Sequence, residues 1–108
     1  MNLELVKQQE SANDGQTIHL FYDNTVGMYL AFGLSAYYST MSVDPVISYS
    51  DALGMPVALL NRGLIQYLRQ SVTKVEHLPQ MYYRFRLRTK VGVAGYRRWR
   101  NEMFPNIS

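Results

Sequence analysis

The chain has 108 residues, of which 47% are hydrophobic and 18% are charged, and its net charge is +3 at pH 7. This length and balance indicate one globular domain and exclude an intrinsically disordered chain. The absence of cysteine excludes a disulfide framework, thiolate catalysis and cysteine-bound zinc.

The amino-terminal segment argues against export, and the longest uncharged segment argues against a membrane span. Residues 1–11 are polar and lack the apolar core of a secretory signal. No charge occurs between residues 24 and 43, but Asn, Ser and Thr interrupt that segment, whereas a span needs about 20 predominantly apolar residues. We therefore expect a soluble cytoplasmic protein without a membrane partner.

The first half of the chain predicts an arm, a strand and a helix. Residues 1–16 end in the turn-forming sequence SANDG and are expected to form a polar arm before a single domain over 17–108. Residues 17–22 are β-rich and mostly apolar, which predicts a buried strand. Apolar residues over 28–41 recur at helical spacing and predict a helix. A hairpin strand over 28–32 before a shorter helix is the competing interpretation.

In the second half of the chain, predicted strands alternate with predicted helices. Strands are expected over 45–49 and 72–77, and helices over 60–71 and 94–103. Residues 55–59 fit either a short strand or the start of a helix. The alternation predicts an α/β (α+β) domain with a mixed β-sheet and about three helices.

Residues 82–90, YYRFRLRTK, carry a cation at every second position from Arg84 onward. This alternation predicts a strand with cations on one face, about 7 Å apart, a spacing similar to that of successive phosphates on one nucleic-acid strand. The segment therefore favours a nucleic-acid-binding strand. The alternative is a solvent-exposed face whose cations protect an edge strand from aggregation.

Positive charge is concentrated near the carboxyl end. Residues 1–80 contain four Lys or Arg against seven Asp or Glu, whereas residues 81–108 contain seven against one. A local patch indicates an anionic partner more strongly than diffuse charge does. The expected phosphate contacts are Arg84, Arg86, Arg88 and Lys90, assisted by Arg97, Arg98 and Arg100. Tyr82, on the basic side of the strand, is expected to stack on a base.

Two other segments resemble a known family. VGMYLAFGLSAY (26–37) and GMPVALL (54–60) are similar to segments of the amino-terminal mismatch-recognition domain of the DNA mismatch repair protein MutS. The resemblance covers residues 17–75 and implies the mixed α/β fold of that domain, together with DNA contact and a role related to DNA repair.

The sequence differs from that family at the two positions that contact a mispaired base in the family. The family has a phenylalanine that stacks on the mispaired base and, two residues later, a glutamate that contacts it. Met28 and Leu30 stand at these positions. Met28 remains a candidate apolar wedge, whereas Leu30 cannot make the carboxylate contact. No GxxxxGK[ST] motif occurs, so the family's ATPase machinery is absent from this chain.

The remaining motifs favour a protein that is not an enzyme. His19 and His77 belong to no HxH or HExxH pattern, so we expect structural or surface histidines and neither a metal nor a cofactor. There is also no GxSxG nucleophile elbow. The predicted function is non-catalytic nucleic-acid binding, with DNA favoured.

A protein-interaction or homo-oligomerisation module without a nucleic-acid role is the alternative function. The nine tyrosines and the apolar segment 26–32 would form its contact. The stripe formed by Tyr96, Trp99 and Met103 in the last helix is expected in the core, with a role as an anchor for a partner protein as the alternative.

Overall fold

Four helices and six strands follow one another in the residues that the computed structural model describes, 1–79 and 82–107. In chain order they are α1 (Leu3–Ser11), β1 (Thr17–Asp23), β2 (Met28–Phe32), α2 (Leu34–Ser39), β3 (Val46–Ser50), β4 (Met55–Leu60), α3 (Arg62–Gln70), β5 (Val72–Leu78), β6 (Tyr82–Leu87) and α4 (Tyr96–Met103).

The strands form one sheet in the order β3-β4-β2-β1-β6-β5, and neighbouring strands are antiparallel in every pair. The predicted α/β (α+β) class is confirmed, but the sheet is antiparallel where a mixed sheet was expected. The physical reason lies in the connections, because β1–β2, β3–β4 and β5–β6 are hairpins, and short hairpins join only antiparallel strands.

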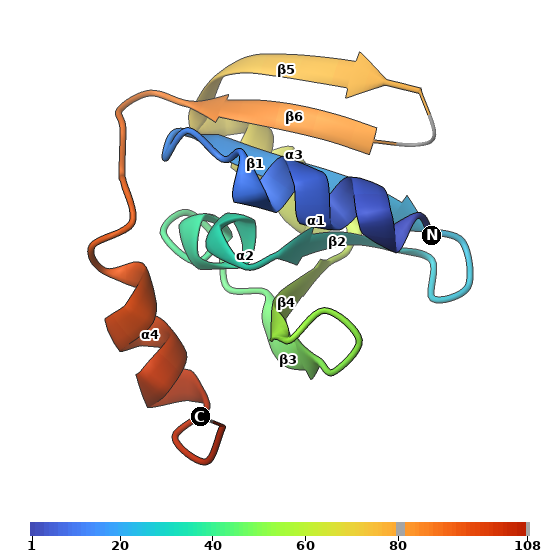
Figure 1. Cartoon of the computed structure of the whole chain (residues 1–108). Coiled ribbons are helices and arrows are strands. Elements are labelled where there is room, and N and C mark those ends of the chain that lie inside the picture. Colours follow the sequence, from blue (N-terminus) through green and yellow to red (C-terminus); the bar gives the residue numbers. More distant parts are fainter. Residues whose placement is uncertain (80–81, 108) are drawn as a thin grey trace.

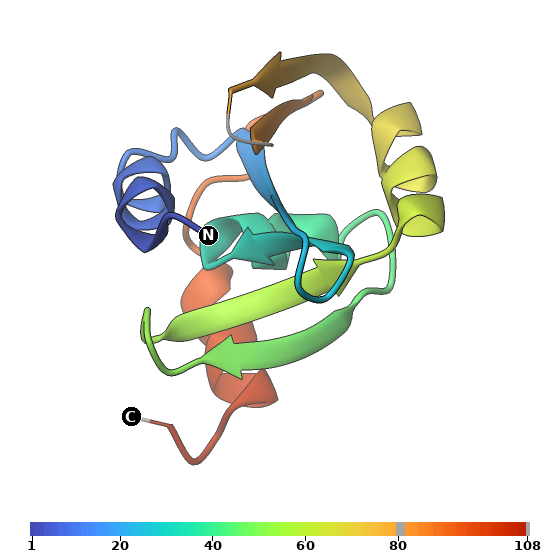
Figure 2. The same cartoon turned by 90° about the vertical axis from the view of Figure 1, so that its right-hand side faces the viewer.

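The sheet has a helix on each side. Figure 2 shows α1 on one side and α3 on the other, and we call these sides the α1 face and the α3 face. The larger core lies on the α3 face, where Ile18, Leu20 and Phe85 pack with residues of α2 and α3. A smaller core on the α1 face joins Val6 of α1 to Phe21 of β1.

The segment 28–41 contains both a strand and a helix. Residues 28–32 form β2 and α2 follows, so the competing hairpin interpretation is correct and the helix over 28–41 is wrong. Gly33 separates the two elements with φ of 58°, a left-handed conformation that glycine adopts without steric cost. Residues 55–59 likewise lie in a strand, β4.

The two ends of the chain also differ from expectation. The range 1–16 contains α1, whose Asn2 side chain accepts a hydrogen bond from Leu5 N at 3.1 Å and caps the helix. The strand expected over 82–90 ends at Leu87, and an irregular segment leads to α4. No helix in the described residues is long and apolar enough to cross a membrane.

Candidate nucleic-acid interface

Tyr82 lies under α1 and is only 4% exposed. Its ring stacks on Phe21 with the centroids 4.7 Å apart. Its hydroxyl donates to Gln9 Oε1 at 3.0 Å and also hydrogen-bonds His19 Nδ1. Tyr82 is therefore part of the core and is not available to stack on a base. The polar sequence of residues 1–16 did not predict the helix that covers this strand, so the alternation alone placed Tyr82 on an exposed face.

Arg84 and Arg86 lie on the α1 face, and each has a carboxylate partner. Arg84 Nη2 lies 3.5 Å from Glu76 Oε2 on the neighbouring strand, and Arg86 Nη1 lies 2.9 Å from Asp14 Oδ2. Burial opposes ionisation of Asp14, but hydrogen bonds from Arg86, Gln16 and Thr17 outweigh it and lower the Asp14 pKa to about 2. These two guanidinium groups are thus locally neutralised by acids from earlier in the chain.

Arg88 and Lys90 lie beyond the end of β6. Arg88 is exposed, and its Nη2 donates to the carbonyl of Gln70 at 3.1 Å, at the carboxyl end of α3. Lys90 is also exposed. The four cations of residues 84–90 therefore do not form the single row that the alternation predicted.

The three cations of α4 lie far from β6. Figure 1 shows α4 beyond the opposite end of the molecule from the β5–β6 hairpin. Arg100 donates to the Tyr49 hydroxyl of β3 at 2.9 Å, while Arg97 and Arg98 are exposed. The seven predicted cations thus occupy separate regions, and α4 does not extend the surface of β6.

Met28 begins β2, where it pairs with Asp23 and is half-buried. The exposed apolar side chain of this hairpin is instead Val26, which is 55% exposed in the turn. Within the segment 26–32, Leu30 and Phe32 are buried, so the contact proposed for that segment would involve mainly Val26 and its neighbours in the turn.

Four aromatic rings cross the α3 face side by side. Tyr22 and Tyr29 have centroids 5.0 Å apart, Tyr29 and Tyr83 5.7 Å, and Tyr83 and His77 4.5 Å. The three tyrosines are half-buried and His77 is exposed. We call these residues the aromatic row. The aromatic row spans β1, β2, β5 and β6. Its rings come together only through the pairing of these strands, which could not be predicted from the sequence.

The surroundings of the aromatic row carry positive charge. The described strand residues that share its face include no Asp or Glu, and α3 contains Arg62 and Arg69 but no acid. Leu60 pairs with Tyr29, which places the start of α3 beside the row. No ion pair joins Arg62, Arg69 or Arg88 to a carboxylate within the described parts of the chain.

A polar hollow of about 260 Å³ lies under α1. Its lining is Gln9, Ala12, Asp14, Thr17, His19, Glu76, Arg84 and Arg86. Burial, and then the charge of Arg84, lower the His19 pKa to about 4, so this imidazole is neutral at pH 7. Charges of both signs balance here, which argues against a polyanion. In the described residues, no three His, Asp or Glu side chains are placed to hold a metal ion.

Glu10 is a buried carboxyl group that connects α1 to α2. Ser35 Oγ donates to Glu10 Oε2 at 2.5 Å, and Ser35 N donates to Oε1 at 3.2 Å. The same hydroxyl accepts from His19 N at 2.9 Å. Burial raises the Glu10 pKa to about 7, although the hydrogen bonds from Ser35 act in the opposite direction. This group therefore holds the helices and the sheet together.

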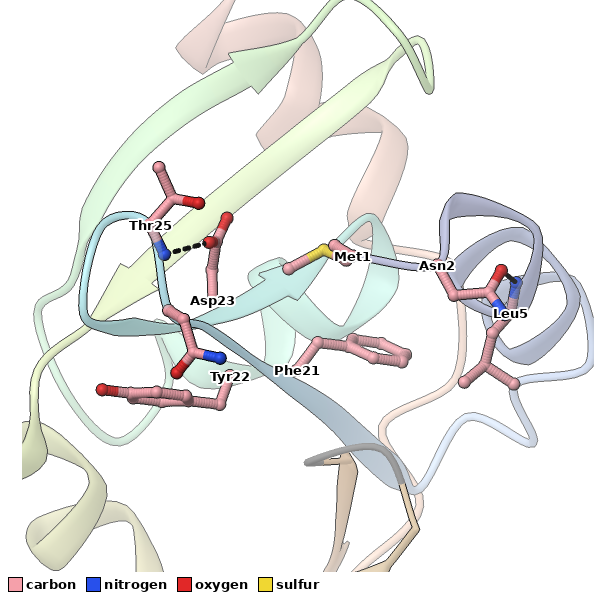
Figure 3. A pocket seen from close by; sticks show the side chains of 8 residues that line it. Met1, Asn2, Leu5, Phe21, Tyr22, Asp23 and Thr25 are labelled. Carbon is pink, nitrogen blue, oxygen red and sulfur yellow. Dashed lines mark hydrogen bonds between the residues drawn. The ribbon is translucent and has the colours of Figure 1, made fainter.

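A larger hollow of about 520 Å³ lies between the start of α1 and the β1–β2 turn (Figure 3). The residues that line it include no Lys or Arg. Asp23 points into this region and accepts a hydrogen bond from Thr25 N at 2.8 Å (Figure 3). With the Asp23 carboxylate and no Lys or Arg side chain in its lining, the hollow does not suit a phosphate.

Comparisons with models of known protein families, with curated proteins and with solved structures find no match for this chain. The resemblance to the MutS amino-terminal domain therefore stays a prediction based on the two segments quoted above.

Proposed function

We propose that this chain is a non-catalytic nucleic-acid-binding domain that binds a single strand on the aromatic row. The observation that carries the proposal is the row itself, a set of adjacent rings on a face whose strands contribute no acid. DNA is favoured over RNA by the resemblance to the MutS domain, which also suggests a role related to DNA repair in the cytoplasm.

Stacking supplies the affinity in this proposal. An aromatic side chain that stacks on a base contributes about 1–3 kcal/mol, and every base has a ring face to offer. Paired bases in a duplex keep their faces covered, whereas a single strand exposes them. The row therefore favours a single strand over a duplex, with little dependence on base sequence.

Phosphate contacts come from the cations around α3. Arg62 and Arg69 belong to this helix, and Arg88 reaches its carboxyl end. Each phosphate neutralised by such a side chain releases condensed counterions, so the affinity falls as salt concentration rises. Arg84 and Arg86 have no part in this surface because they are paired with carboxylates on the other face.

Binding of a fluorescent single-stranded DNA tests the proposal. Replacing Tyr22 and His77 with Leu puts an aliphatic side chain in place of each ring at the ends of the row. We expect about 10-fold weaker binding or more, since one stacked base corresponds to about 1–3 kcal/mol. Phe104→Leu makes the same kind of change beside α4, away from the row, and should leave the affinity unchanged.

Two results would contradict the proposal. One is the absence of binding at low salt by the wild-type protein. The other is equal affinity in the Tyr22→Leu/His77→Leu variant and the wild type, with both proteins folded by thermal melting.

A further inference from the structure

We propose that two copies of this chain associate through β3, which pairs antiparallel with β3 of the second copy and joins the two sheets. This interface lies at the edge of the sheet opposite β5 and is separate from the aromatic row. It would form without nucleic acid.

The two edges of the sheet differ in their protection against pairing. β5 carries Lys74 and Glu76 and has a register irregularity between Val72 and Lys74, features that discourage the addition of another strand. β3 has the sequence VISYS, without charge, proline or a register irregularity. Its outer edge offers backbone groups that an extended strand satisfies. Figure 2 shows β3 as the outermost strand on its side.

An apolar surface lies next to this edge on the α1 face. A groove of about 340 Å³ is lined by apolar side chains that include Leu30, Val57 and Leu59, and by the polar side chains of Asp23, Ser48 and Ser50. Val46 of β3 is 65% exposed. Leu3 is exposed on the same groove. A strand added to β3 would lie beside Val46 and cover part of its exposed side chain.

The sequence of β3 suits pairing with itself. A two-fold axis at Ser48, the middle residue, pairs all five residues of the strand and places Val46 opposite Ser50 and Ile47 opposite Tyr49 of the second copy. An aromatic residue opposite a β-branched residue is a favourable cross-strand pair, and this one occurs twice. In this register Asp51 faces Pro45, so no like charges oppose each other.

The first test compares two valines of similar exposure. Val46→Lys places a charge in the proposed interface, whereas Val93→Lys places it at a 62%-exposed position in the segment before α4. Analytical ultracentrifugation should find dimers for the wild type and Val93→Lys and monomers for Val46→Lys. A monomeric wild type at high protein concentration, or a dimeric Val46→Lys variant, overturns the proposal.

The second test reads the register directly. The chain has no cysteine, so Ser48→Cys provides one thiol that would lie opposite its own copy, within the distance that a disulfide requires. Mild oxidation should cross-link Ser48→Cys but not Val46→Cys, whereas a mixture of Val46→Cys and Ser50→Cys should yield cross-linked heterodimers. Equal cross-linking of Ser48→Cys and an exposed Ala94→Cys control would contradict this pairing.

Discussion

Single residues decide how α1 is held, and Glu10 is the clearest case. Glu10 is only 8% exposed, and its carboxyl group accepts hydrogen bonds from Ser35 at the start of α2. Glu10 lies four residues after Val6 on the same face of α1, but the polar composition of this helix does not identify a buried carboxyl group. The sequence therefore predicted an arm where the structure has a helix fixed by a polar contact.

The raised pKa of Glu10 predicts a loss of stability as pH rises. The folded-state pKa of about 7 exceeds the ordinary value of 4.5, so the stabilising contribution is complete below pH 4.5 and is lost as pH rises through 7. Glu10→Gln removes this titration. We expect the free energy of unfolding of the wild type, relative to Glu10→Gln, to fall by roughly 2–3 kcal/mol between pH 5 and pH 8.

Urea unfolding at several pH values measures this change. Glu4→Gln alters an exposed acid of the same helix and should leave the pH dependence of the wild type in place. A Glu10→Gln variant with the same pH dependence as the wild type would show that Glu10 does not titrate in this range.

At the scale of elements, local signals predicted the strands better than the helices. β1, β3 and β6 follow from their β-rich or alternating sequences. The hairpin at 28–32 was ambiguous because β2 and α2 are both apolar, and only the left-handed Gly33 separates them. Asp14, in the loop after α1, pairs with Arg86, and Glu76 of β5 pairs with Arg84. The sequence could not predict these ion pairs because they depend on the order of the strands in the sheet.

The docking of α4 on α2 depends on a glycine. A methyl group on Gly95 would overlap the hydroxyl group of Tyr37, whose ring lies 5.4 Å from that of Trp99. We expect Gly95→Ala to displace α4 and to expose Trp99, the one tryptophan of the chain. The measurement is tryptophan fluorescence, which should shift to longer wavelength. Ala94→Ser, at the exposed neighbouring position, should leave the emission unchanged, and an unshifted Gly95→Ala spectrum would contradict this packing.

At the scale of the whole molecule, the two faces and two edges of the sheet differ in chemistry. The α1 face holds balanced charges, the α3 face holds the aromatic row with nearby arginines, and β3 is the unprotected edge. The sequence predicted the fold class and the excess of positive charge near the carboxyl end. The candidate site does not lie on the basic strand and helix that the sequence predicted. Folding separates the cations of those elements and brings together aromatic rings from four strands.

Binding of a single strand on the aromatic row can be tested by photo-cross-linking a single-stranded DNA that contains halogenated bases, followed by mass spectrometry of the peptides. We expect cross-links to Tyr22, Tyr29, Tyr83 or His77, and a decrease in their yield as salt concentration rises. Cross-links confined to α4 or to the polar hollow under α1 would contradict it.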